Sequence, residues 1–179
     1  MVSWAREMYN EMSDETGEFF NFMVEHDLFD LETRQGKHLG GYCTVLPSFK
    51  APFIFSNFNG TSADVDVLTH EAGHAFQYYV ASRHLQLDSL SFSTNEINEI
   101  HSMTMEYFAY PWMHKFFGDK VDMYKYFHMC ESILIIPYIV CVDEFQHKVY
   151  DNPEMTAEER YRVWKELEKE YLPGRDYDG

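Results

Sequence analysis

Positive charge is scarce in this chain of 179 residues. Lysine and arginine together number 14, against 30 aspartates and glutamates, which gives a formal net charge of −16 at pH 7. A protein that binds nucleic acid needs a basic surface to contact the phosphates. The composition therefore excludes nucleic acid as a partner.

Cysteine is also rare. Cys43, Cys130 and Cys141 are odd in number and far apart in the sequence, a pattern that does not indicate a disulfide framework. The first residues, Met1 to Glu7, are polar and lack the apolar stretch of a signal peptide. We therefore expect reduced thiols and a cytoplasmic protein.

Long hydrophobic runs are missing as well. The longest, Ile133 to Val142, is interrupted by Pro137 and has about half the length that a membrane-spanning helix requires. We expect no contact with a membrane. The sequence contains no internal repeat, no low-complexity segment and no linker long enough to separate two domains, so it predicts a single domain over residues 1–179.

Aromatic residues, by contrast, make up 17% of the chain, and there are 10 methionines, as suits a well-filled helical interior. The predicted fold is mainly α with a small antiparallel β element. Apolar spacing and capping patterns predict helices over residues 3–26, from about 63 to 84, from about 94 to 110, 122–150 and 156–171, and strands over 42–46 and 52–58.

His70, Glu71 and His74 form an H-E-x-x-H motif inside the second of these helices. Residues four apart lie on one face of a helix, so both imidazoles can reach one metal ion. Glu71 projects near that ion and can take a proton from a water that the metal activates. The motif is typical of zinc hydrolases, most of which are peptidases.

The residues around the motif favour metal binding over the alternative, a surface helix with two solvated histidines. The helix is strongly apolar, with Leu68, Ala72 and Phe76 beside the motif. Burying two imidazoles and a carboxylate is costly unless they are paired or bind a metal. Gly73 weakens a helix by about 1 kcal/mol relative to alanine, which indicates that another segment packs closely against it.

A catalytic zinc ion usually has three protein ligands, and Glu99 is our candidate for the third. Ser93 and Glu96 have the spacing of a capping box, which gives Glu96 a structural role at the start of a new helix. Glu99 then lies one turn further on with no such task. Glu106 lies two turns beyond Glu99, too far to share the ion, and we assign it to the second shell or to the substrate cleft. His101 points away from Glu99, and we expect it to lie at the surface or in packing.

Motifs along most of the chain resemble a known family. Residues 40–44 (GGYCT), 52–55 (PFIF) and 57–61 (NFNGT) lead into 70–77 (HEAGHAFQ), with Glu99 and Ser102 downstream. This ordered series resembles the oligoendopeptidase F and Pz-peptidase branch of the M3 zinc metallopeptidases. The resemblance implies a zincin-like helical catalytic core.

By this resemblance, His70, His74 and Glu99 match the family's zinc ligands, and Glu71 matches its general base. The resemblance thus implies a zinc-dependent endopeptidase that binds one Zn²⁺ per chain and cleaves oligopeptides. It also implies that the substrate backbone lies along an edge strand, for which Phe53 to Phe58 is the candidate. No individual substrate-binding residue is predicted.

The family's other expected parts have no counterpart in this sequence. These are a large helical N-terminal region, and a segment after the zinc site that is rich in histidine and tyrosine and stabilises the oxyanion. We therefore expect the zinc-binding core of a larger enzyme, truncated at both ends. The alternative is a catalytically impaired zinc-binding fragment or interaction module.

The sequence also allows a different interpretation of the metal-binding residues. Glu71 with His74, and Glu144 with His147, are both Glu-x-x-His pairs, as found in helical di-iron carboxylate proteins. That interpretation leaves His70 without a task. For Glu144 and His147 we favour a surface pair at i,i+3.

Overall fold

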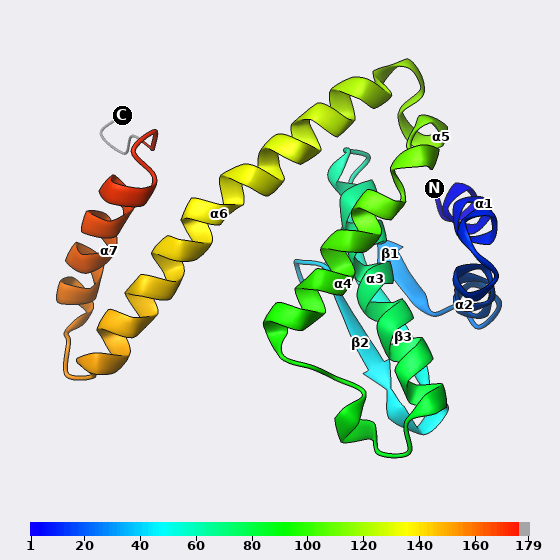
Figure 1. Cartoon of the computed structure of the whole chain (residues 1–179), viewed down its shortest axis with the longest axis horizontal. Coiled ribbons are helices and arrows are strands. Elements are labelled where there is room, and N and C mark those ends of the chain that lie inside the picture. The colour runs from blue at the N-terminus through cyan, green and yellow to red at the C-terminus, as the bar shows by residue number, and fades with distance from the viewer. Residues whose placement is uncertain (176–179) are drawn as a thin grey trace. The chain divides into compact units, whose positions relative to one another are not determined.

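The structure is a computed structural model of the chain and describes residues 1–175 (Figure 1). It forms two compact units, residues 1–121 and the residues from 122 onwards. The single domain expected over residues 1–179 stays a prediction. The fold class is confirmed, since helices dominate both units and a small sheet lies in the first.

The first unit begins with two helices, α1 (Val2–Met12) and α2 (Asp14–Glu25), where one helix over residues 3–26 was predicted. The break between the two helices is at Ser13. Ser13 has extended backbone angles and forms a capping box with Thr16, which starts a new helix. The aromatic side chains of α2 pack into the interior of this unit, where Phe19 and Phe20 are fully buried.

The sheet has three strands in the order β1-β3-β2 and is mixed. The predicted antiparallel pair is present as β2 (Tyr42–Leu46) and β3 (Ala51–Phe58). The sequence analysis missed β1 (Phe29–Glu32), which runs parallel to β3. The small β element is therefore mixed and not purely antiparallel.

The prediction that Phe53 to Phe58 forms an edge strand is wrong. These residues belong to β3, which pairs with β1 on one side and with β2 on the other. Strand β3 is thus the central strand of the sheet, and its residues Ile54 and Phe55 are paired on both sides. The edges of the sheet are β1 and β2.

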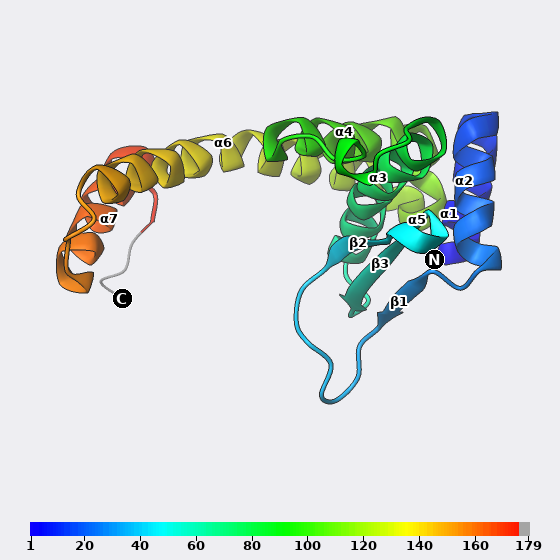
Figure 2. The ribbon, with the colours of Figure 1, turned by 90° about the horizontal axis from the view of Figure 1, so that it is seen from below.

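The long helix α3 (Ala63–His84) crosses the sheet, and α4 (Asn95–Phe108) lies beside it (Figures 1 and 2). Figure 2 shows the strands on one side of α3 and α4 on another. The helix begins at Ala63, close to the predicted start. The Asp64 carboxylate accepts hydrogen bonds from the backbone N–H groups of Asn59 and Gly60, which joins the end of β3 to the first turn.

The capping box predicted from Ser93 and Glu96 does not form at the start of α4. The N-cap is Thr94 and makes no side-chain cap bond, while the Ser93 hydroxyl donates to Asn98 Oδ1. The helix still begins at Asn95, so Glu99 keeps its predicted position one turn from the start. Short helical turns follow α4: Tyr110–Trp112, α5 (His114–Phe117) and Gly118–Lys120.

The second unit consists of α6 (Val121–Asp151), which is continuous through Pro137, and α7 (Ala157–Tyr171). Thr156 and Glu159 form a capping box at the start of α7. The ring of Trp164 packs edge-on against Phe145, with 5.3 Å between the ring centroids. These contacts join the two helices.

Residues 114–151 contain a stretch that is long and apolar enough to cross a membrane, judged by length and composition alone. Its mean hydropathy is 1.4, and 11% of its apolar window is buried within the described residues. Apolar helices in the interior of soluble proteins have the same composition. The expected absence of membrane contact stays a prediction.

Gly73 sets the separation of α3 and α4. A Cβ atom at this position would lie 2.7 Å from Ser102 Cα and 2.9 Å from the His101 carbonyl oxygen. Both are backbone atoms of α4, so they cannot move aside as the end of a side chain can. The predicted close packing against Gly73 is confirmed, and α4 is the segment that makes it.

Gly73→Ala should therefore destabilise the protein although alanine is the better helix former. We expect the free energy of unfolding to fall by about 1–3 kcal/mol, because the added methyl group overpacks the contact and pushes α4 away. Urea denaturation measures this change. Gly174→Ala is the matched control, since no atom lies within 4 Å of a Cβ there. Equal stability of the two variants would show that the helices are not in essential contact.

Candidate metal centre

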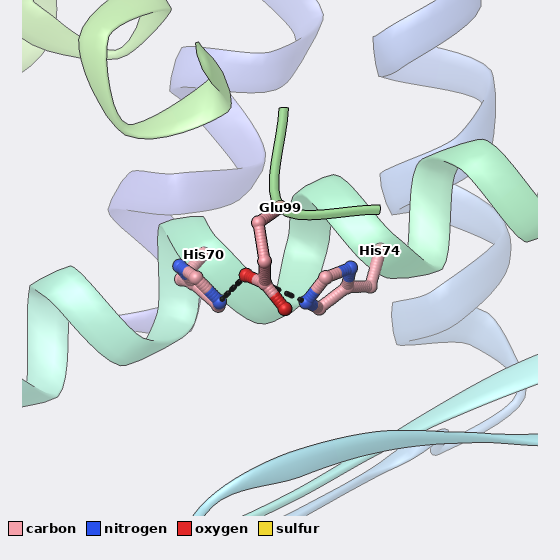
Figure 3. Close-up of side chains that lie close together, drawn as sticks. All are labelled: His70, His74 and Glu99. Carbon is pink, nitrogen blue, oxygen red and sulfur yellow. Dashed lines mark ion pairs between the residues drawn. The ribbon is translucent and has the colours of Figure 1, made fainter. Parts of the chain in front are cut away.

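Three candidate ligands from two helices converge on one point (Figure 3). Among residues 1–175, His70, His74 and Glu99 form a group whose ligand atoms all lie within 4.8 Å of one another. Glu99 Oε2 is 3.2 Å from His70 Nε2 and 3.7 Å from His74 Nε2. Figure 3 shows the Glu99 carboxylate between the two imidazole rings.

The helices account for this convergence. His70 and His74 lie one turn apart on α3 and present their rings on the same side. Glu99 reaches them from the first turns of α4, which the glycine contact holds against α3. Two imidazole nitrogens and one carboxylate oxygen are a donor set that suits a catalytic zinc ion. The residues present thus fit the metal that the motif predicts.

Glu106 orients the first histidine. Its Oε1 lies 2.6 Å from His70 Nδ1, while His70 Nε2 faces Glu99. A carboxylate on the second ring nitrogen fixes the tautomer of a ligating histidine and raises its basicity. Glu106 thus supports the candidate ligand His70 from behind and is not itself one of the three converging side chains, as the sequence indicated.

Ser102 orients the third candidate ligand. Its hydroxyl donates a hydrogen bond of 2.8 Å to Glu99 Oε2, and Ser102 is fully buried. The two residues lie three apart on α4, at a spacing where side chains meet. This spacing is visible in the sequence, but the sequence analysis placed Ser102 only within the family motifs.

Glu71 lies on another side of α3, toward the sheet. It is 8% exposed, and its carboxylate accepts a hydrogen bond from the backbone N–H of Cys43 on β2. Burial raises the pKa of Glu71, against the opposing effects of His70 and of this hydrogen bond. The contribution of Cys43 was missed, because pairing between distant segments leaves no local signal in the sequence.

The two histidines differ in charge environment. Burial lowers the pKa of His70, but the hydrogen bond and the charge of Glu106 outweigh it, so the net pKa is raised. For His74, burial and then the charge of His70 lower the pKa. His74 thus favours the neutral form that metal binding requires.

The other candidate residues lie outside the cluster. His101 Nδ1 is buried without a hydrogen-bond partner, and the residue lines a groove between α3 and α4, in agreement with a packing role. Glu96 is exposed at the start of α4.

The second Glu-x-x-His motif makes other contacts. Glu144 pairs with Lys148 at 3.0 Å, and His147 lies 3.7 Å from Asp143. The i,i+3 contact expected between Glu144 and His147 is thus replaced by i,i+4 pairs. Among residues 1–175, neither residue belongs to a group of three side chains that could hold a metal.

An H-E-x-x-H helix whose two histidines lie beside a glutamate of the next long helix is typical of helical metallopeptidases. The comparisons with known proteins specify the class further. The profile of peptidase family M3 matches residues 4–178, and the chain belongs to this family.

Solved structures agree with the family. An oligoendopeptidase F is 56% identical with a TM-score of 0.94 over 99% of this chain, and Pz peptidase A, determined with an inhibitor, is 52% identical with a TM-score of 0.95 over 99%. An oligoendopeptidase F from Bacillus anthracis str. Ames is 53% identical with a TM-score of 0.89 over 96%. None of the curated proteins compared with the chain matches it.

This chain spans about a third of each of these relatives, 31%, 32% and 31% of their respective lengths. The family and the fold of the matched third are thereby established.

Glu106→Gln should weaken zinc binding while leaving the fold intact. Glutamine keeps the shape of the side chain but removes the charge that polarises His70, so we expect zinc affinity to fall by about tenfold. Competition with a fluorescent chelator measures the affinity. Glu96→Gln, an exposed change on the same helix, is the matched control. Equal affinities in the two variants would contradict the orienting role of Glu106.

Proposed function

We propose that this chain carries the catalytic zinc site of an endopeptidase that cleaves oligopeptides. One Zn²⁺ is bound by His70, His74 and Glu99. The observation that carries the proposal is the convergence of these three side chains, in a chain of peptidase family M3. Pz peptidase A, a solved relative, was determined with an inhibitor, and the likeness to it supports a peptidase function for this chain.

When bound, zinc acts as a Lewis acid and makes water nucleophilic near neutral pH. Glu71 acts as the general base: its carboxylate takes a proton from the attacking water and then delivers it to the departing amine. The hydrogen bond from the Cys43 backbone holds this carboxylate in place. His70 and Glu99 are held by Glu106 and Ser102 respectively.

The substrate backbone is proposed to lie along the outer edge of β2. This strand pairs with β3 on one side only, and its Cys43 contacts Glu71. A peptide that adds to the edge of a sheet is held by main-chain hydrogen bonds, which tolerate many sequences. Strand β2 thus takes the part that the sequence analysis assigned to residues 53–58.

A cytoplasmic location and the absence of membrane and nucleic-acid partners remain part of the proposal. The three free cysteines and the acidic charge support it.

A zinc-binding module without turnover is the alternative. The chain spans about a third of its solved relatives. Loss of one oxyanion donor costs about 10²–10³ in kcat, so groups outside this third would influence the rate strongly. Zinc binding and hydrolysis therefore have to be measured separately.

Glu71→Gln should abolish peptide hydrolysis and leave zinc bound. The amide keeps the size of the side chain and cannot accept the proton, while the three ligands are unchanged. Cleavage of an internally quenched peptide measures the activity, with and without a chelator, and zinc content is measured in parallel. Glu96→Gln is the control. Cleavage by Glu71→Gln at the parent's rate would refute the role of the base, and zinc binding without any cleavage by the parent would favour the inactive module.

Elemental analysis should find one zinc ion per chain. His74→Ala should lose it, because only two ligands remain, whereas His147→Ala should retain it. Two iron ions per chain, lost in both variants, would instead support the di-iron site built from Glu71 and His74 with Glu144 and His147.

A further inference from the structure

A row of exposed side chains, nearly all apolar, runs along α6 and takes no part in the candidate metal centre. Its members are alternately three and four residues apart, which is the spacing of a heptad repeat. They are Tyr126, Met129, Ile133, Ile136 and Val140, and each is between 43% and 66% exposed. Because successive residues of a helix point about 100° apart, this spacing keeps all five on one side of α6. We call these five residues the α6 seam.

Helix α7 covers a different side of α6. Tyr138 and Phe145 pack edge-on against Trp164 of α7, with 6.4 and 5.3 Å between ring centroids, and Figure 1 shows α7 beside the C-terminal half of α6. Cys141, on the same side, is fully buried. A second row of exposed apolar residues leads along α6 toward Cys141 and comprises Met123, Phe127 and Leu134. The α6 seam lies away from this row and stays exposed over about four turns.

A second copy of α6 offers a matching surface. If two copies run antiparallel about a two-fold axis, Ile133 of each copy meets Ile136 of the other. In the same register Met129 meets Val140, so the centre of the contact is apolar throughout. This arrangement is self-complementary, as an interface between identical chains must be.

The charges at the ends of the seam favour the antiparallel orientation over the parallel one. In the antiparallel register Asp122 meets His147 of the second copy, and Tyr126 meets Asp143. Asp122, Asp143 and His147 are all exposed. A parallel pair would instead place each aspartate against the same aspartate of the other copy, which like-charge repulsion disfavours.

The size of the seam suits a weak but specific dimer. Because its five side chains are about half exposed, pairing would remove roughly 500 Å² from each copy and about 1,000 Å² in total, which reaches the lower limit of a specific protein interface. Helix α6 also has the length and composition of a membrane span. Glu131, however, lies on the side opposite the seam, where its charge is costly in lipid and harmless in a pair of helices.

We propose that the α6 seam is an interface between two copies of this chain, which pair through α6 in antiparallel orientation with Ile133 of each copy against Ile136 of the other. The inference goes beyond the proposed peptidase function and needs neither zinc nor hydrolysis. It commits the seam to a second copy of the same chain.

The test is sedimentation velocity of the full chain at about 1–200 µM, where we expect a reversible equilibrium of monomer and dimer. Ile133→Glu places a carboxylate at both contacts of the dimer and should raise the dissociation constant about a hundredfold, because each charge is buried without a partner. Leu134→Glu, at a residue that is 67% exposed on another side of α6, is the matched control and should dimerise like the parent. Circular dichroism checks that the helices persist, as expected for glutamate at exposed helical positions.

A mixing experiment tests the orientation. Ile136→Lys should be monomeric for the same reason as Ile133→Glu. An equimolar mixture of these two variants should recover dimers, because the new carboxylate at 133 meets the new ammonium group at 136 of the other chain and the remaining isoleucines meet each other. Added salt should weaken the recovered dimer. In a parallel pair the two new charges would not oppose each other, and mixing would recover nothing.

Each other outcome overturns the inference. A parent chain that stays monomeric throughout the concentration range would show that the seam is not an interface between copies and leave it to further polypeptide. Binding of the monomer to phosphatidylcholine vesicles, lost in Ile133→Glu, would assign the seam to a membrane instead. Equal effects of Ile133→Glu and Leu134→Glu would remove the seam from any dimer, and failure of the mixture to recover dimers would contradict the antiparallel register. Peptide cleavage, measured in parallel, judges the proposed function independently of all these results.

Discussion

The contact between Gly73 and the backbone of α4 is the constraint on which the site depends. His70 and His74 flank this glycine on α3, and Glu99 lies one turn before Ser102, the residue that the glycine touches. A side chain at residue 73 would push α4 away from α3 and so move Glu99 away from the two histidines. A glycine that weakens its own helix by about 1 kcal/mol is thus explained by the approach that it permits between ligands on different helices.

Because of helix geometry, the residues of the H-E-x-x-H motif face two different neighbours, α4 and the strand β2. Successive residues on a helix point in directions about 100° apart, so Glu71 cannot face α4 together with His70. It faces β2 instead, where the Cys43 backbone donates to it. The histidines are positioned by one helix and the proposed base by one strand. Helix α3 presents the two histidines toward α4 and Glu71 toward β2, so the candidate metal centre and the proposed substrate edge lie on neighbouring sides of this one helix.

Much of this arrangement could be predicted from local sequence. The helical periodicity located α3, α4 and α6 nearly at their observed bounds, and Glu99 was singled out by its position one turn into α4. The cap assigned to this helix was wrong, since Thr94 and not Ser93 is the N-cap. The choice of Glu99 over Glu96 was unaffected, because it depended on where the helix begins more than on how the helix is capped.

Non-local relations could not be predicted in the same way. Strand β1 has four residues and pairs with a strand about 25 residues later in the chain, and no local pattern marks such pairing. Without β1, β3 was mistaken for an edge strand. The contact of Glu106 with His70 likewise depends on how α3 and α4 cross. Helical spacing predicted the correct side of α4 for Glu106, while only the structure identifies the nitrogen that it contacts.

The negative charges around the candidate site would also link metal binding to folding stability. Glu71, Glu99 and Glu106 gather about two histidines, and the charges of Glu99 and Glu106 both raise the pKa of Glu71. Like charges held this close oppose folding unless a cation compensates them. A divalent ion at His70, His74 and Glu99 would do so, and its binding would stabilise the folded chain through mass action. The carboxylates that serve the proposed chemistry would thus also couple metal binding to the stability of the fold.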